Sequence, residues 1–189
     1  MAGDLIVVFG GSGFVGRHVV KALARAGKRV RVAVRRPHLA NDLRVLGDVG
    51  QIQIVQANVR YPDSVARALE GATGVINLVG ILYERGKQNF FDIQEEGAAT
   101  IAAHAAKLGI RRFVQMSAIG ADPKSHARYA RTKGEAEESV RTAIPEALII
   151  RPSIVFGPGD GFFNRFADMA KFAPVLPSIG FGNTKFQPV

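Results

Sequence analysis

Apolar residues occur along this chain in short continuous runs that alternate with stretches of helical spacing. Short continuous runs are typical of strands buried on both faces of a sheet, whereas apolar residues recurring about every three to four positions indicate helices. The helical spacing predicts helices that begin after residue 16, cover 62–69 and 90–108, include residues 129 to 133, and cover 162–172. The apolar runs predict strands at residues 5–9, 30–34, 52–56, 74–80, 112–116 and 148–151.

Strands that alternate with helices through short connections predict a mostly parallel sheet with helices on both faces. The expected fold class is therefore α/β, a Rossmann-type doubly wound sheet. A hydrophobic fraction of 47% over 189 residues is enough for one full core, whereas a second complete domain is not expected. We expect the main domain to cover residues 1–156.

The first predicted strand runs directly into three glycines, Gly10, Gly13 and Gly16, and then into helical spacing. Such glycines permit a tight turn, a close approach of the main chain to a pyrophosphate, and close packing of helix on strand. The helix that follows directs its unpaired N–H groups at the phosphates. Because the strand and the helix are both present, the pattern predicts a dinucleotide site. The residues expected to contact the nucleotide here are Gly10, Ser12, Gly13, Phe14, Val15 and Gly16.

The ends of two later strands are expected at the same edge of the sheet, where ligands of open α/β sheets lie. The fourth strand runs into Leu78, Val79 and Gly80, and the sixth is followed by Pro152 and Ser153. We expect the first three residues to line the cofactor cleft and the last two to lie toward its nicotinamide end.

The end of the second strand carries Arg35 and Arg36, and no acidic residue occurs between Asp4 and Asp42. A site for NAD normally places an Asp or Glu about twenty residues beyond the glycines, where it accepts hydrogen bonds from the ribose hydroxyls. A guanidinium would instead pair with the 2′-phosphate of NADP. We therefore predict NADP(H), with NAD(H) as second choice, and Arg35 before Arg36 as the contact. The alternative is that both arginines are only surface residues of a loop.

Candidate chemistry lies between Ser117 and Lys133, where a strand end leads into a helix. Tyr129 and Lys133 are four residues apart, so they share one face of that helix. A lysine ammonium beside a phenol favours the phenolate, which lowers the pKa of the tyrosine and makes it a usable general acid or base. The hydroxyl of Ser117 is a candidate to hold a substrate oxygen. The predicted catalytic residues are thus Tyr129, Lys133 and Ser117.

Composition and charge exclude several other kinds of site. The chain has no cysteine and four histidines without ligand spacing, so we expect no disulfide and no metal site. The net charge of +9 is concentrated early, with eight basic residues and one acidic residue between Met1 and Arg36. Half of these basic residues follow the spacing of a solvated helix face, so we expect no nucleic-acid partner.

The chain carries four motifs: Gly10-x-x-Gly13-x-x-Gly16, Asn58-Val59, Tyr129-x-x-x-Lys133, and Arg151-Pro-Ser-Ile-Val-Phe-Gly-Pro158. Together they resemble the short-chain dehydrogenase/reductase superfamily, in its extended and atypical branches, which usually has Asp-Val in place of Asn58-Val59. A finer pattern adds Gly10-Gly-Ser-Gly-Phe-Val-Gly-Arg17, Met116-Ser-Ala-Ile-Gly-Ala121 and Tyr129-Ala-Arg-Thr-Lys133. It is most similar to the nucleotide-binding accessory subunits of respiratory complex I and their bacterial relatives.

This resemblance implies tight NADPH binding and a structural or regulatory role in a respiratory or quinone-linked protein complex. It also implies that Asn58 and Val59 lie at the adenine and that Lys133 holds the ribose hydroxyls of the nicotinamide. No apolar run is long enough for a membrane span and the first strand begins soon after Met1, so we expect no transmembrane segment and no leader peptide. The expected location is the cytoplasm, with a peripheral position at the inner membrane as a further possibility.

The chain departs from the superfamily at two positions that matter for catalysis. Extended members place the catalytic hydroxyl one residue beyond Ser117, where this chain has Ala118, and an asparagine near Gln94. These departures favour nucleotide binding without turnover. The alternative is an active NADPH-dependent reductase or epimerase that acts on a quinone, a sugar nucleotide or another carbonyl compound.

The C-terminal stretch is expected to begin a second, smaller lobe. Extended members continue into a lobe that supplies most of the substrate pocket, and residues 157–189 match only its start. We expect the substrate lobe to be largely absent, either because the chain is naturally short or, as we favour, because it is truncated.

Overall fold

The computed structural model describes residues 4–161, 163–172 and 187–189. It divides into two compact units, Met1–Arg151 and Pro152–Val189. The division falls a few residues before the expected boundary after residue 156. Each unit is described separately below.

Strands of the first unit form one fully parallel sheet. Every neighbouring pair runs parallel, and within the described residues the strand order is β3-β2-β1-β4-β5-β6. The expected Rossmann-type α/β fold is therefore confirmed. The strands are β1 (Leu5–Phe9), β2 (Arg29–Val34), β3 (Ile52–Gln56), β4 (Gly74–Asn77), β5 (Phe113–Met116) and β6 (Leu148–Ile150).

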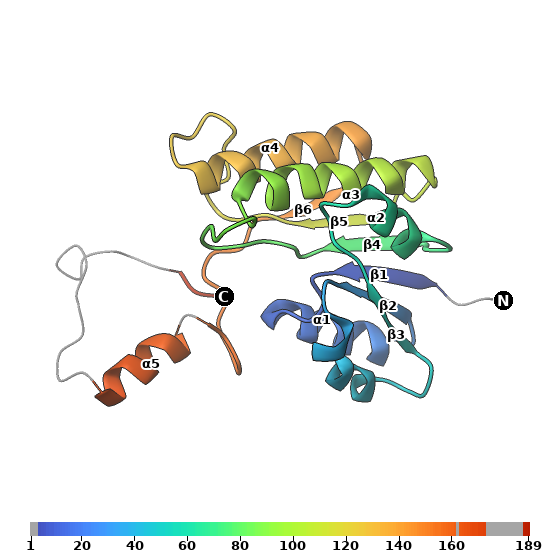
Figure 1. Ribbon diagram of the computed structural model, residues 1–189, viewed down its shortest axis with the longest axis horizontal. Helices are drawn as coiled ribbons and strands as arrows, with labels where there is room; N and C mark the ends of the chain where they lie inside the picture. The colour runs from blue at the N-terminus through green and yellow to red at the C-terminus, as the bar shows by residue number, and fades with distance from the viewer. Residues whose placement is uncertain (1–3, 162, 173–186) are drawn as a thin grey trace. The chain divides into compact units, whose positions relative to one another are not determined.

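Helices cover both faces of this sheet, with α2, α3 and α4 on one face and α1 on the other (Figure 1). A π-helical turn, η3, leads directly into α3, so the predicted single helix over 90–108 is two joined elements. Two 3₁₀ turns, η1 and η2, were not predicted from the sequence because each is too short to show a helical period. The bounds are α1 (Phe14–Arg25), η1 (Pro37–Leu39), η2 (Asn41–Leu46), α2 (Pro62–Leu69), η3 (Phe91–Glu95), α3 (Glu96–Lys107) and α4 (Arg128–Ala143).

Alternation along the strands divides the core into two layers. Val7 and Phe9 of β1 face α3 and α4, whereas Val8 between them faces α1, and all three are at most 1% exposed. Burying a side chain of this size stabilises the fold by about 1.5–3 kcal/mol. Central strands buried on both faces explain why β1 reads as a continuous apolar run rather than an alternating one.

The order of the strands also determines where a ligand is expected. Chain connections run outward in opposite directions from β1 and β4, which are neighbours in the sheet. Loops that leave the carboxyl ends of these two strands therefore diverge and open a crevice between them, the usual ligand site of a doubly wound sheet.

The second unit contains α5 (Phe163–Phe172). Two backbone hydrogen bonds, between Phe156 N and Val189 O and between Val189 N and Ile154 O, bring the last residues of the chain beside residues 154–156. Within the helix predicted over 162–172, the side chain of Met169 is 42% exposed. The proline- and glycine-rich stretch from Pro174 lies mostly outside the described residues. Among the described helices of both units, none has the length and apolar character of a membrane span.

Candidate functional site

A pocket of about 240 Å³ opens at the carboxyl ends of β1, β2 and β4. It therefore occupies the crevice that the strand order predicts. The lining residues that the sequence predicted are Gly10, Ser12, Gly13, Arg35, Val59, Leu78, Val79 and Gly80. Those that it did not predict are Phe9, Ala33, Val34, Ala57, Ile81, Gln88 and Ile93.

The turn between β1 and α1 forms one wall of the pocket. Gly10 has a φ of 77°, a left-handed conformation that favours glycine, and its carbonyl accepts the N–H of Gly13 at 3.0 Å. A Cβ on Gly16 would lie 2.4 Å from that same carbonyl oxygen, so the helix starts closer to the strand than any other residue permits. Gly16 thus packs against the turn and does not line the pocket. Phe14 and Val15, which were also predicted to contact the nucleotide, do not line it either.

The first turn of α1 is chemically suited to an anion. Its N-cap residue, Gly13, supplies no side-chain hydrogen bond, and its first turn contains no acidic residue. The N–H groups at this end therefore keep their capacity to donate, and the positive end of the helix dipole is not neutralised locally. A phosphate group is a matching partner for such an end.

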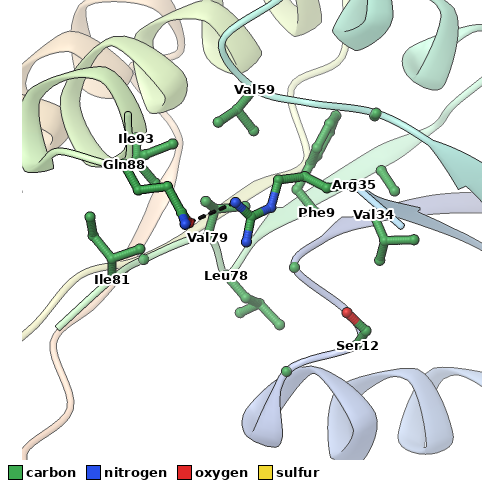
Figure 2. Close-up of a pocket in the computed structure, with 15 residues that line it drawn as sticks. Phe9, Ser12, Val34, Arg35, Val59, Leu78, Val79, Ile81, Gln88 and Ile93 are labelled. Atoms are coloured by element: carbon green, nitrogen blue, oxygen red, sulfur yellow. Dashed lines mark hydrogen bonds between the residues drawn. The ribbon is translucent and has the colours of Figure 1, made fainter. Parts of the chain in front are cut away.

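Arg35 follows β2 directly and also lines the pocket. Its Nη1 donates a hydrogen bond of 2.6 Å to Oε1 of Gln88, and Figure 2 shows the two side chains extending toward each other. Arg36 does not line the pocket and is the N-cap of η1. Arg35 thus lines the pocket and Arg36 does not, and the contact of Arg35 with a 2′-phosphate stays a prediction.

Asn58 and Val59 follow β3 and have different environments. Val59 lines the pocket, whereas Asn58 does not. Oδ1 of Asn58 accepts a hydrogen bond from the backbone N–H of Arg60 at 3.2 Å. The backbone N–H of Asn58 donates to Oγ of Ser64 at 3.0 Å. In the structure Asn58 closes the turn that presents Val59, and its predicted contact with the adenine stays a prediction.

Tyr129 and Lys133 lie on α4, and the electrostatics of the tyrosine differ from expectation. Burial raises the pKa of Tyr129, and its ring packs edge-on against Phe90 with centroids 5.7 Å apart. The expected lowering of the pKa of Tyr129 by Lys133 is therefore wrong for this structure. The reason is the burial of the phenol itself, which disfavours the phenolate. Lys133 is 4% exposed, and burial lowers its pKa to about 8, partly opposed by the charge of Glu137.

Ser117 is 4% exposed and donates its hydroxyl proton to Oε1 of Glu137. Arg151 binds the same carboxylate through Nε at 2.9 Å and Nη2 at 2.5 Å. Burial alone would raise the pKa of Glu137, but the hydrogen bonds from Arg151 and Ser117 lower it overall. The hydroxyl is thus engaged within the protein, whereas the sequence expected it to face a substrate; a catalytic role for Ser117 stays a prediction.

Gln94 and Lys133 both lie close to Gly80 of the pocket wall. It is 2% exposed, its Nε2 donates to Oγ1 of Thr132 at 3.4 Å, and its Oε1 has no partner among the described residues. A Cβ on Gly80 would lie 3.2 Å from Nζ of Lys133 and 3.5 Å from this oxygen. Gly80 lines the pocket, so both polar groups converge on its wall without lining it themselves.

Pro152 and Ser153 belong to the second unit, so their predicted place at the nicotinamide stays a prediction.

Gln88 and Ile81, two pocket residues that the sequence did not predict, lie in an irregular loop that periodicity cannot locate. Ile93 lies in the predicted helix over 90–108, and its apolar character there favoured the core as strongly as a pocket wall.

A glycine turn at the crevice of a doubly wound sheet, with a cation among the lining residues, defines a nucleotide-binding Rossmann domain. The chain belongs to the NAD(P)H-binding family, whose match covers residues 10–160. The resemblance to short-chain dehydrogenase/reductases and to accessory subunits of complex I is also confirmed by the relatives that follow.

The rat protein NADH dehydrogenase (ubiquinone) 1 alpha subcomplex subunit 9, mitochondrial, is 38% identical over 191 residues, which cover 100% of this chain and 50% of that protein. The ceramide reductase of Caulobacter vibrioides is 35% identical over 178 residues, 94% of this chain and 55% of that protein. The chain thus spans about half the length of these relatives. Among solved structures, a putative NAD-dependent epimerase/dehydratase from Bacillus halodurans is similar with a TM-score of 0.72 and 25% identity, covering 82% of this chain and 72% of that one.

Proposed function

We propose that this chain binds NADPH and acts as a structural or regulatory nucleotide-binding subunit of a respiratory or quinone-linked protein complex. The observation that carries the proposal is that Arg35 lines the same pocket as the glycine turn. Similarity to a complex I subunit over the whole chain supports the partner. A cytoplasmic location, peripheral to the inner membrane, belongs to the same proposal.

The preference for NADPH over NADH is supported by the charges on the pocket wall. Among the described lining residues Arg35 is basic and none is acidic. The first carboxylate that follows β2, Asp42, forms an ion pair with Arg17 instead. A 2′-phosphate therefore has a guanidinium to pair with, whereas ribose hydroxyls find no carboxylate on the pocket wall to accept hydrogen bonds from them.

A role without turnover is supported by the state of the predicted catalytic groups. The raised pKa of Tyr129 keeps it a weak acid and leaves almost no phenolate near pH 7. Ser117 is bound to Glu137, and Ala118 has no hydroxyl. A nucleotide that binds only the folded state would still stabilise the chain, by about 2.7 kcal/mol at a hundred times its Kd.

The alternative is an NADPH-dependent reductase or epimerase that acts on a quinone, a sugar nucleotide or another carbonyl compound. It is favoured by the convergence of Lys133 and Gln94 on Gly80, and by the similarity to a protein named ceramide reductase. In that case the bound cofactor would supply the hydride and Tyr129 the proton, with Lys133 holding the ribose.

These functions are separated by releasing the nucleotide from purified protein, identifying it by mass, and following its redox state in the native protein after a quinone is added. Tightly held NADPH that stays reduced supports the structural subunit. Exchangeable NADPH that is oxidised only when a substrate is present supports the reductase, and protein that binds neither NADPH nor NADH contradicts both.

A further inference from the structure

A loop of residues 81–90, here called the strap, leads from β4 to η3 and contributes two residues to the pocket wall, Ile81 and Gln88. Its tip is a tight turn in which Arg85 and Gln88 exchange backbone hydrogen bonds of 2.9 and 3.1 Å. Gln88 therefore stands at a fixed point of the loop.

The strap is tied to elements on both sides of the pocket. Nη1 of Arg60, which follows β3, donates to the carbonyl of Lys87 at 3.0 Å. The carboxylate of Glu84 accepts from Nη1 of Arg128 on α4 at 2.9 Å and from the backbone N–H of Phe90 at 2.8 Å. These contacts hold the strap where Gln88 reaches Arg35, so the hydrogen bond between them is supported by the surrounding fold.

We propose that Gln88 determines specificity for the 2′-phosphate of the nucleotide, acting through Arg35; this inference rests on the proposed function. In the free protein the carboxamide oxygen of Gln88 accepts the Nη1 proton of Arg35 at 2.6 Å and so holds the guanidinium at the pocket wall (Figure 2). When NADPH binds, a phosphate oxygen replaces the carboxamide oxygen on that proton.

The choice of a carboxamide is what makes this exchange favourable. A glutamine holds an arginine without neutralising it, so Arg35 keeps its full charge for the incoming phosphate. The amide also carries two N–H donors, which can turn toward the phosphate once the oxygen is released. Because Arg35 is already positioned, less side-chain freedom is lost when the nucleotide binds.

The test is the ratio of NADPH to NADH affinity in Gln88→Glu, measured by calorimetry on the purified chain. A glutamate would neutralise Arg35 and repel the phosphate, so NADPH affinity is expected to fall at least about tenfold, which corresponds to about 1.4 kcal/mol. NADH affinity is expected to change less than about threefold, because its ribose hydroxyl carries no charge. Gln88→Ala should give a smaller loss for NADPH of about threefold, from lost positioning.

The chain offers a matched control in Arg31 and Gln53. These side chains form the same kind of bond, from Nε to Oε1 at 2.9 Å, but between β2 and β3 and away from the pocket lining. Gln53→Glu changes the net charge identically and should leave the affinity ratio unchanged. In an Arg35→Ala background, Gln88→Glu should lose most of its effect, since the two residues act together.

The outcomes distinguish this inference from the function on which it rests. Wild-type protein that binds NADPH, combined with an unchanged ratio in Gln88→Glu, overturns the role of Gln88 alone. Equal losses for both nucleotides, or the same loss in Gln53→Glu, also overturn it. Wild-type protein that binds neither nucleotide overturns the proposed function and this inference with it.

Discussion

Arg35 and Lys133 are two cations with opposite environments in the same unit. Arg35 follows β2, is exposed and lines the pocket, whereas Lys133 on α4 is buried, with 4% exposure. Burial penalises the charged form of Lys133 and lowers its pKa. The first residue is therefore suited to recognise an anion and the second to respond to pH.

The role of Arg35 is tested by Arg35→Asp. A carboxylate at this position would repel a 2′-phosphate and accept hydrogen bonds from ribose hydroxyls, so NADPH affinity should fall at least about tenfold more than NADH affinity. Titration of both nucleotides against wild type and variant measures the difference. Arg36→Asp, outside the pocket lining, is the matched control and should leave the ratio nearly unchanged. Losses of equal size for both nucleotides in Arg35→Asp would contradict the assignment.

The buried lysine predicts a pH dependence of stability. The folded pKa of Lys133 is about 8, below its ordinary value of 10.5, so the unfolded chain holds the proton more tightly. The free energy of unfolding should therefore increase as pH rises from about 8 to 10.5, by on the order of 3 kcal/mol at most. The folded state thus becomes more stable over this range. Below pH 8 this group is protonated in both states and contributes no slope.

Other groups also titrate in this range, so the measurement is the difference between wild type and Lys133→Met. Denaturant unfolding at a series of pH values should show the wild type gaining stability relative to the variant between about pH 8 and 10. Parallel pH profiles for the two proteins would mean that Lys133 is more solvated than its 4% exposure indicates.

At the scale of elements, the contact between β1 and α1 is what brings the helix terminus to the pocket. Sequence spacing predicted both elements because each is long enough to show its period. It did not find η1, η2 or the strap, since short turns and irregular loops depend on the residues that they meet elsewhere in the fold. The π-helical turn η3 was also hidden, although it carries Ile93 of the pocket wall and the buried Gln94.

Gly16→Ala tests the closeness of this contact. The new Cβ would lie 2.4 Å from the carbonyl oxygen of Gly10 and 2.6 Å from Gly11, both backbone, so α1 must move away from the turn. Overpacking of this kind costs about 1–3 kcal/mol, and the displaced helix terminus should also weaken binding of both nucleotides equally. Thermal unfolding and nucleotide titration measure the two effects. Gly161→Ala, which meets no atom within 4 Å, is the control and should be close to neutral.

At the scale of the whole molecule, every pocket residue belongs to the first unit, Met1–Arg151, which has its own two-layered core. Within this unit Arg151 forms an ion pair with Glu137, whose side chain is 5% exposed. Residues 1–151 therefore contain all that the described pocket needs, and Pro152 and Ser153 lie outside this unit.

A chain ending after Arg151 should fold and bind 2′,5′-ADP as tightly as the full chain, because the groups expected at that half of the nucleotide are retained. If Pro152 and Ser153 contact the nicotinamide, its affinity for whole NADPH should fall several-fold. Circular dichroism checks the fold and calorimetry gives both affinities. Unchanged NADPH affinity would contradict the predicted role of these two residues, and loss of 2′,5′-ADP binding by folded protein would contradict the independence of the pocket.

The strands, the longer helices, the glycine turn and the basic end of β2 could be predicted without the structure, because each follows from residues that are neighbours along the chain. The folded structure was needed to show that Gln88 meets Arg35, that Ser117 donates to Glu137, and that burial raises the pKa of Tyr129. These features depend on groups that lie far apart in sequence, Arg35 and Gln88 being separated by 53 positions. Local pattern carries no information about such pairs, since burial and partner choice are properties of the packed molecule.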